Sequence, residues 1–399
     1  MNRTPQIIRR YDLDWLRVIA FILLIFYHVG MMYVSWGWHI KSTYISSNLE
    51  YLMLMLNQWR IPLLFFVSGC AIFFASTRYH DRQLLKLRVQ RLLLPIIFGI
   101  LVIVPPQLYF EMLYDGALSA KTTNYLEFYW QYLDKNSELF RGYETPLWGH
   151  MTWNHMWFVV YLLFFSIFFY GMKKLPLSSF SERAYSIIFP ADRLKLLLIP
   201  CLPFLLLGLV LREPFPSTYA FYNDWYNNLF FFTFFIYGYW LAKNNSIWQL
   251  TDQHRRYFLS VALSCYTLLM LMNTLPDDVT WIPEWVESII DRIILYIRYI
   301  NTWAWILMLC GFAHHYLNKN SRYLRYLNEA VFPYYILHQT ITIVIGYPLT
   351  QLGLGRIIEP SLIIIGTFLL SALGFEIVKR INILRPWFGL KKSSINSQN

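Results

Sequence analysis

The chain alternates between long apolar runs and short polar connections. Ten runs are long enough to form membrane-spanning helices, at residues 13–36, 52–76, 92–113, 154–174, 195–211, 228–243, 257–275, 289–313, 331–350 and 360–378. In hydrocarbon every backbone N–H and C=O must be bonded within the protein, and a helix of about 20 residues satisfies this while crossing about 30 Å. The pattern therefore predicts an all-α, polytopic transmembrane helix bundle of about ten spans.

The basic residues are unevenly shared between alternate connections. Of the 34 Lys and Arg residues, 24 fall in the set of connections that includes both ends of the chain, and 6 fall in the opposite set. The other four, Arg17, Arg60, Arg292 and Arg298, lie within or at the edges of the runs. Lys and Arg concentrate in cytoplasmic loops, so we expect both termini to be cytoplasmic.

Composition supports a membrane protein and argues against a nucleic-acid-binding one. The 399 residues are 57% hydrophobic and only 14% charged, whereas soluble domains are about 25% charged. The formal net charge is +11, but the basic residues are scattered between apolar runs and form no patch of the kind that binds nucleic acid. The four cysteines lie in apolar runs without paired spacing, which indicates buried thiols and no disulfide framework.

The first apolar run, LDWLRVIAFILLIFYH, contains two residues that are costly in a membrane. Arg17 and His28 are 11 residues apart, so a helix places them on nearly the same face, about 16 Å apart along its axis. One interpretation is that Arg17 reaches the cytoplasmic interface and His28 is a buried structural histidine. The other is that His28 is a general base, since a neutral imidazole accepts a proton from a hydroxyl near neutral pH.

A pair of arginines precedes the third run, in KLRVQRLLLP. Arg88 and Arg91 are spaced i, i+3, so they project from one helix face on the expected cytoplasmic side. Such a pair binds anionic lipid in many membrane proteins. It also suits the phosphates of a soluble ligand, because planar guanidinium groups form paired hydrogen bonds.

Further polar residues occur at membrane depth or near its outer face. Arg60 (QWRIPLLFFVSG) and His338 (VFPYYILHQTI) lie inside apolar runs, and His155 (NHMWFVVYLL) begins the fourth. Polar groups at such depth face a bundle interior or a water-filled cavity, so His28, Arg60 and His338 predict a polar pocket. The sequence has no Gly-rich phosphate loop, HExxH, GxSxG or metal-ligand cluster, and we expect no metal.

The order of these motifs resembles that of the membrane-bound acyltransferase-3 family. The resemblance covers roughly residues 11–385 and is nearest to the branch of osmoregulated periplasmic glucan succinyltransferases. Arg-x10-His in the first run and RxxR before the third are its specific parts. It implies an acyltransferase membrane domain at 1–385 and a cytoplasmic tail at 386–399. A soluble esterase-like domain, which some members carry after the tenth span, is not expected.

The resemblance also implies roles for these residues. His28 matches the family's proposed catalytic histidine and Arg17 its partner, while Arg88 and Arg91 match the pair that handles acyl-coenzyme A. The expected donor is a cytoplasmic acyl-CoA, acetyl-CoA or succinyl-CoA, and the expected acceptor a hydroxyl of a periplasmic or cell-surface glycan. A bacterial inner-membrane, multi-pass protein surrounded by lipid is therefore expected, with no nucleic-acid partner.

The acceptor is expected to enter from the outer side. The outer connections at 114–152 and 276–288 are aromatic and acidic, and Trp148, Trp153, Trp157 and Trp281 are possible sugar platforms or members of an interfacial aromatic belt. Glu111 and His155 would supply polar contacts there, with Arg60 and His338 in the substrate pocket.

The alternative function is a secondary transporter whose intramembrane Arg and His residues relay protons, but the sequence shows no internal repeat or paired broken helices. The sequence does not determine the oligomeric state.

Overall fold

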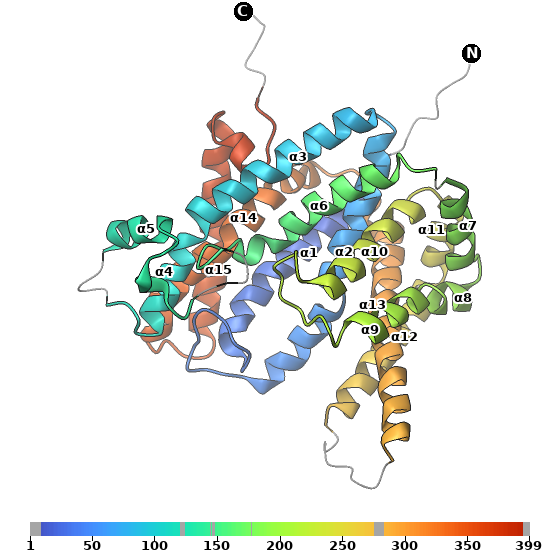
Figure 1. The fold of residues 1–399 in the computed structure, drawn as a ribbon, viewed down its shortest axis with the longest axis horizontal. Coiled ribbons are helices and arrows are strands. Elements are labelled where there is room, and N and C mark those ends of the chain that lie inside the picture. Colours follow the sequence, from blue (N-terminus) through green and yellow to red (C-terminus); the bar gives the residue numbers. More distant parts are fainter. Residues whose placement is uncertain are drawn as a thin grey trace, which may run out of the picture. The chain divides into compact units, whose positions relative to one another are not determined.

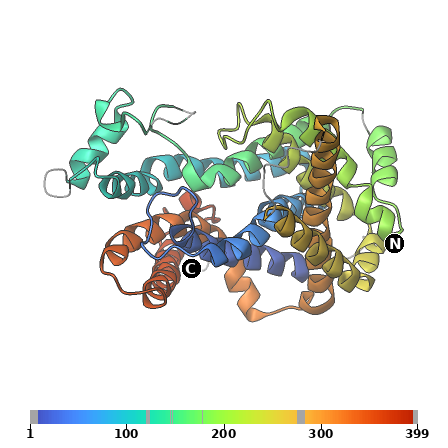
Figure 2. The same cartoon turned by 90° about the horizontal axis from the view of Figure 1, so that it is seen from below.

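The computed structural model describes residues 9–119, 124–143, 145, 148–176, 178–274 and 283–393. Within these ranges the chain is helical, with a few isolated β-bridges near Trp148 and no strand. Figures 1 and 2 show the helices from two sides. The prediction of an all-α fold is confirmed.

Fifteen α-helices follow one another along the described chain. Their bounds are α1 Tyr11–Gly30, α2 Ser47–Ser76, α3 Asp81–Phe98, α4 Pro105–Tyr114, α5 Tyr125–Leu133, α6 Trp157–Met172, α7 Ser178–Ile188, α8 Arg193–Leu198, α9 Cys201–Leu211, α10 Trp225–Leu241, α11 Asn245–Gln253, α12 Arg255–Met272, α13 Glu284–Leu317, α14 Arg322–Gln351 and α15 Ile358–Arg380. Four short 3-10 turns, η1 Met31–Tyr33, η3 Glu138–Phe140, η4 Asn154–Met156 and η5 Arg385–Phe388, and one π turn, η2 Gly99–Ile103, complete them.

Each of the ten predicted runs falls on helix. Within the described ranges, seven helical stretches are long and apolar enough to cross a membrane: Tyr11–Tyr33, Ser47–Ser76, Asp81–Tyr114, Asn154–Met172, Arg193–Leu211, Trp285–Leu317 and Ile358–Arg380. On α15 many large apolar side chains are exposed, as on a lipid-facing helix: Leu362, Ile365, Leu369, Leu370, Leu373 and Ile377. The total of ten spans and the cytoplasmic termini stay predictions. The amphipathic helices α5, α7 and α11 lie between the predicted runs and were not predicted.

The helices form two compact units, each built from separate stretches of the chain. Unit 1 comprises residues 1–20, 54–84 and 167–324, and unit 2 comprises residues 21–53, 85–166 and 325–399. In unit 1 the long helices α12 and α13 pack along each other (Figure 1). In unit 2 helices α4 and α5 lie together in both ribbon views.

Two glycines let helices α2 and α10 of unit 1 approach backbone to backbone. A Cβ atom added to Gly69 would lie under 3.0 Å from the carbonyl oxygen of Phe235, and one added to Gly238 would meet the carbonyl oxygen of Phe66 in the same way. Small residues at such crossings are typical of membrane helices, where close van der Waals contact drives association. The Cys70 thiol lies 3.1 Å from the Gly238 carbonyl oxygen, to which it donates a weak hydrogen bond.

The start of α1 is anchored in unit 1 by a buried carboxylate. Asp12 is only 1% exposed, and it accepts hydrogen bonds from Arg10 at 2.6 Å and from His314 at 3.2 Å. The Arg10 guanidinium lies 4.0 Å from the ring centroid of Trp248. A buried charge needs partners of this kind, and these hold the entry into the first membrane helix.

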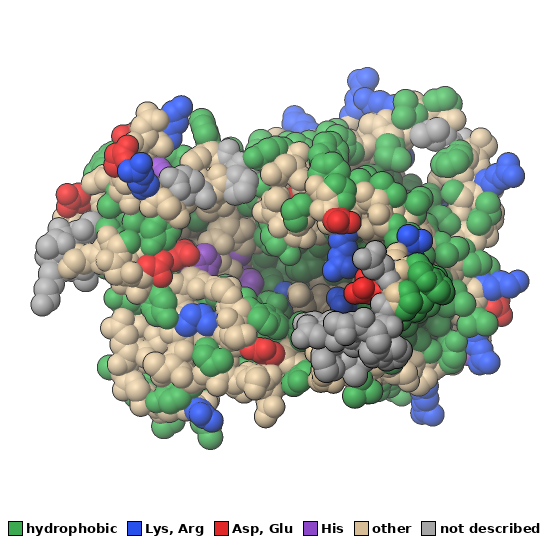
Figure 3. All heavy atoms as spheres, turned by 60° about the horizontal axis from the view of Figure 1, so that its bottom comes forward, with side chains coloured by type: hydrophobic (Ala, Val, Ile, Leu, Met, Phe, Trp, Pro, Cys, Tyr) green, Lys and Arg blue, Asp and Glu red, His purple; other side chains and the backbone are tan. Residues whose placement is uncertain are grey.

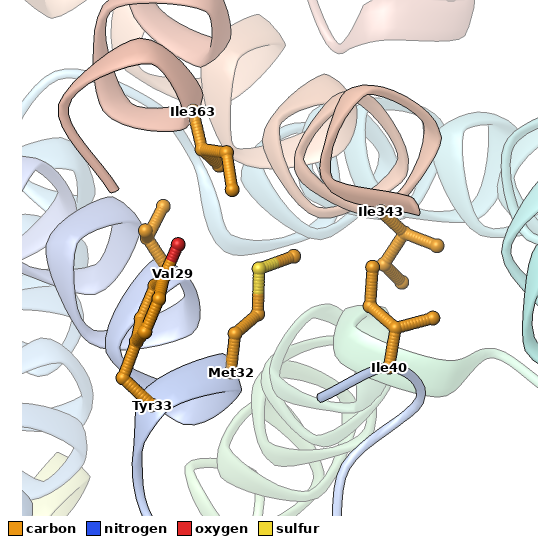
Figure 4. Packing of buried hydrophobic residues seen from close by; sticks show 6 residues of the cluster. All are labelled: Val29, Met32, Tyr33, Ile40, Ile343 and Ile363. Atoms are coloured by element: carbon orange, nitrogen blue, oxygen red, sulfur yellow. The ribbon is translucent and has the colours of Figure 1, made fainter. Parts of the chain in front are cut away.

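In unit 2 a hydrophobic cluster joins the end of α1 to α14 and α15. Val29, Met32 and Tyr33 come from α1 and η1, Ile40 from the loop that follows, and Ile343 and Ile363 from α14 and α15. Figure 4 shows the Met32 side chain directed into the space between these residues. The cluster fixes the end of α1, and therefore the position of His28, against α14.

Candidate active site

Two histidines from opposite ends of the sequence meet inside unit 2. The Nδ1 atom of His28, on α1, lies 2.7 Å from the Nε2 atom of His338, on α14. Their rings are nearly parallel, with centroids 5.0 Å apart and planes at 5°. His338 is fully buried, whereas His28 is half-buried. Two residues of the predicted polar pocket are therefore in direct contact.

A backbone carbonyl determines which nitrogen of each ring carries the proton. His338 Nδ1 lies 2.7 Å from the carbonyl oxygen of Tyr335, and a carbonyl can only accept, so this nitrogen donates. A neutral His338 then has its lone pair on Nε2 and accepts the N–H of His28 Nδ1. A neutral His28 in turn has its lone pair on Nε2. This is the arrangement of a general base oriented by a second group.

Side-chain amides form a polar network beside this pair. Gln107 lies 3.3 Å from His155 through its Nε2 atom, and its Oε1 atom accepts from Asn154 at 2.9 Å and from Gln339 at 3.0 Å. His155 is 6% exposed and contacts the Ile336 carbonyl oxygen at 3.1 Å through Nε2. Its ring meets that of His338 edge-on, with centroids 5.4 Å apart.

The π turn η2 places part of this network. It separates α3 from α4. Three of its carbonyl oxygens accept hydrogen bonds from hydroxyl groups: that of Ile100 from Tyr132 at 2.9 Å, that of Leu101 from Tyr129 at 3.0 Å and that of Ile103 from Thr340 at 2.7 Å. Such turns are frequent at functional sites because they shift the helix face that follows. Here the following helix carries Gln107 and Glu111, one turn apart, toward the histidines.

Glu111 pairs with a histidine that the sequence analysis did not select. His39 Nδ1 donates to Glu111 Oε2 at 2.6 Å, and His39 Nε2 accepts from the amides of Gln339 at 3.2 Å and Asn154 at 3.3 Å. The side chains of His39 and Glu111 are 15% and 27% exposed. Figure 3 shows histidine side chains reaching the surface beside acidic ones.

The loop that carries His39 is held by a lysine. Lys41 Nζ donates to the carbonyl oxygens of Met31 at 2.6 Å and Trp36 at 2.8 Å, and also to that of Val34. Burial lowers the pKa of Lys41, an effect that the nearby Glu50 carboxylate opposes. The Lys41 side chain therefore holds the backbone between η1 and α2 by bonding its carbonyl oxygens.

The predicted arginines lie on the predicted helices. Arg17 is on α1, within unit 1, and its guanidinium lies 3.5 Å from Asp14 one turn earlier. Arg60 is on α2, also in unit 1, and is 4% exposed beside Trp59, which stacks on Trp305 with centroids 6.2 Å apart.

Arg88 and Arg91 share α3 and lie in unit 2. Arg88 is half-buried and donates to Ser166 Oγ at 3.0 Å, while Arg91 is exposed. The i, i+3 spacing on one helix is therefore observed. Ser166, the anchor of Arg88, was not predicted.

The predicted acceptor loops are described only in part. Trp148 is 66% exposed, and Trp153 and Trp157 lie on either side of η4. Trp281 and most of the 276–288 connection lie outside the described residues. The four cysteines are free, and within the described ranges no three His, Cys, Asp or Glu side chains are grouped to hold a metal ion.

Sequence reasoning missed the connecting residues of the site. Glu111 was predicted, but Gln107, Asn154 and Gln339 were not. Gln107 lies four residues before Glu111 in one apolar stretch, and Asn154 and Gln339 each adjoin a histidine, so helical spacing and adjacency were available signals. His39 gave no such signal, because it lies in a polar connection where a histidine is unremarkable.

Comparison with known proteins shows which family and relatives the chain resembles. The profile of the acyltransferase-3 family, described as an acyltransferase domain, matches residues 10–376. Glucans biosynthesis protein C of Shigella dysenteriae serotype 1 is 26% identical over 366 residues, which cover 88% of this chain and 86% of that protein. The protein of the same name from Escherichia coli K12 is 25% identical with the same coverage. No solved structure matches the chain.

Proposed function

Since the chain belongs to the acyltransferase-3 family and is a multi-pass membrane protein, we propose that it transfers an acetyl or succinyl group from cytoplasmic acyl-CoA to a hydroxyl of an extracytoplasmic glycan. The observation that carries this proposal is the His28–His338 pair, in which the half-buried ring is oriented by the buried one. The names of the relatives favour a glucan acceptor.

The proposed reaction uses His28 as the proton acceptor. Nε2 of His28 takes the proton of the acceptor hydroxyl as its oxygen attacks the thioester carbonyl. The carbon–oxygen bond forms, the carbon–sulfur bond breaks, and the departing thiolate takes the proton from His28. The products are a glycan ester and free coenzyme A. His338 positions the His28 ring throughout, because the hydrogen bond from His338 Nδ1 to the Tyr335 carbonyl oxygen fixes the His338 ring.

The remaining predicted residues have binding or supporting roles in this proposal. Arg17 is the partner of His28 and meets the charged end of the donor on the cytoplasmic side, and Arg60 is the cation for a charged acyl group such as succinyl. His155 acts through the amide network instead of touching substrate, because its ring is buried. We propose ten spans with cytoplasmic termini in the bacterial inner membrane, an acyltransferase domain at 1–385 and a tail at 386–399. The acceptor enters past the outer loops.

Arg88 and Arg91 are predicted to bind the phosphates of coenzyme A. The double alanine variant should weaken acyl-CoA binding at least tenfold, since two charge-assisted contacts are lost. Affinity of the wild type should fall as salt rises, and that of the variant should fall less, because screening weakens ionic contacts. Titration calorimetry in detergent at two salt concentrations measures both. Arg82→Ala, an exposed arginine on the same helix, is the control. Unchanged donor affinity in the double variant would mean that the pair is a lipid anchor.

The proposed activity is tested with the purified protein in detergent or nanodiscs. The protein is incubated with acetyl-CoA or succinyl-CoA labelled in the acyl group, with and without a glucose oligosaccharide. The expected result is label on the oligosaccharide in an alkali-labile ester, together with free coenzyme A. If neither donor is consumed while proteoliposomes of the same protein show proton-coupled uptake of a solute, the secondary transporter alternative is correct.

A further inference from the structure

The loop between η1 and α2 presents an aromatic ring beside the histidine pair. Trp38 is half-buried, and its ring lies nearly parallel to that of His28, with centroids 6.3 Å apart and planes at 25°. The ring of His39 meets Trp38 edge-on, with centroids 5.4 Å apart. Trp38 therefore contacts both the proposed base and the His39–Glu111 pair.

Hydrogen bonds within this loop hold the backbone around Trp38 and His39. Lys41 binds three carbonyl oxygens of the same loop, and the backbone N–H of Ser42 donates to the Met32 carbonyl oxygen at 2.9 Å. Ile40, between His39 and Lys41, is fully buried in the cluster shown in Figure 4. Trp38 and His39 are consequently held at fixed positions, as specific binding of a ligand requires.

The His39–Glu111 pair offers polar groups with defined directions. Glu111 Oε2 accepts the hydrogen bond that His39 Nδ1 donates, and the second carboxylate oxygen is also a hydrogen-bond acceptor. The amides of Asn154 and Gln339 contact His39 Nε2 at 3.3 and 3.2 Å, and both also donate to Gln107 Oε1 at 2.9 and 3.0 Å. Pockets for small ligands combine an aromatic wall with a few oriented polar groups of this kind.

These features match a sugar ring. A pyranose has apolar C–H faces that pack on a flat aromatic side chain and a rim of hydroxyl groups that donate to carboxylates. The Trp38 ring is of the right kind for the face, and the Glu111 carboxylate, which His39 contacts, is of the right kind for the rim. A hydroxyl of a ring placed there would be next to His28, which contacts Trp38.

We propose that Trp38 and the His39–Glu111 pair form the subsite that holds the acceptor sugar, with Trp38 packed on the ring and Glu111 bonded to a hydroxyl beside the one that reacts. The inference rests on the proposed function and deepens it, because it assigns the acceptor's position. Trp38, His39 and Glu111 are positioning and specificity residues here, while His28 performs the proton transfer.

The test measures oligosaccharide binding and transfer separately. Binding of a glucose oligosaccharide to the purified protein is measured by calorimetry, and transfer by steady-state kinetics with the acyl-CoA that the wild type uses. Trp38→Ala and Glu111→Gln should raise both the Kd and the KM for the oligosaccharide at least tenfold, while the KM for acyl-CoA stays unchanged. Trp38→Phe should recover part of the loss, because it keeps an aromatic face.

Matched controls separate a subsite from a folding effect. Trp285→Leu removes a tryptophan that is 69% exposed on α13, and His80→Gln removes an exposed histidine before α3; neither should change oligosaccharide binding. Thermal unfolding of each variant shows whether it is folded. If folded Trp38→Ala binds the oligosaccharide as the wild type does, the subsite is wrong. If the wild type binds it in a Trp38-dependent way but never acylates it, the subsite stands and the proposed function fails.

Discussion

Replacement of His28 by alanine is expected to lower kcat by about 10²–10⁴-fold, the range typical for loss of a general base. The folded protein should persist in the membrane, because His28 is half-buried and the neighbouring hydrophobic cluster, which includes Val29, Met32 and Tyr33, keeps its contacts. Steady-state transfer of labelled acyl groups, with thermal unfolding in detergent as the check on folding, measures both quantities.

His338→Gln is the informative companion variant. This variant removes the ring that accepts the hydrogen bond from His28 Nδ1 but keeps His28 itself. The value of kcat should therefore fall less than in His28→Ala. A near-normal kcat in folded His28→Ala would show that another group is the base.

Gly69→Ala and Gly238→Ala are expected to destabilise the protein strongly. Each added methyl group would overlap a backbone carbonyl oxygen of the facing helix, which cannot move aside as a flexible side chain can. Overpacking of a core costs about 1–3 kcal/mol, and more where the obstacle is backbone. We expect Tm to fall by several degrees, or the yield of folded protein to collapse, as measured by thermal unfolding and size-exclusion chromatography in detergent.

Gly171→Ala is the matched control for these two variants. Gly171 lies on α6, and a Cβ atom built there has nothing within 4 Å. Alanine favours a helix over glycine by about 0.5–1 kcal/mol, so this variant should melt at the wild-type temperature or slightly above. Equal Tm values for Gly69→Ala and Gly171→Ala would contradict the close contact of α2 with α10.

The residues that carry most of the candidate site differ in how far the sequence revealed them. His28 and His338 were predicted because a polar side chain within an apolar run has a measurable cost and therefore a reason. Their contact was not predicted, since they are 310 residues apart and a hydropathy pattern contains no information about which helices are neighbours. The RxxR pair was found from helical periodicity alone, whereas its partner Ser166 came only with the packing of α3 and α6.

The sequence by itself determined that this is a helical membrane protein with polar residues at depth. That outcome is local: lipid requires each segment to bond its own backbone, so composition within about 20 residues decides helix and span. The tertiary structure decided that His28 meets His338, that His155 is buried, and that His39 meets Glu111. Those facts depend on side chains brought together from α1, α4 and α14 and from a loop held by Lys41, and no short stretch of sequence contains them.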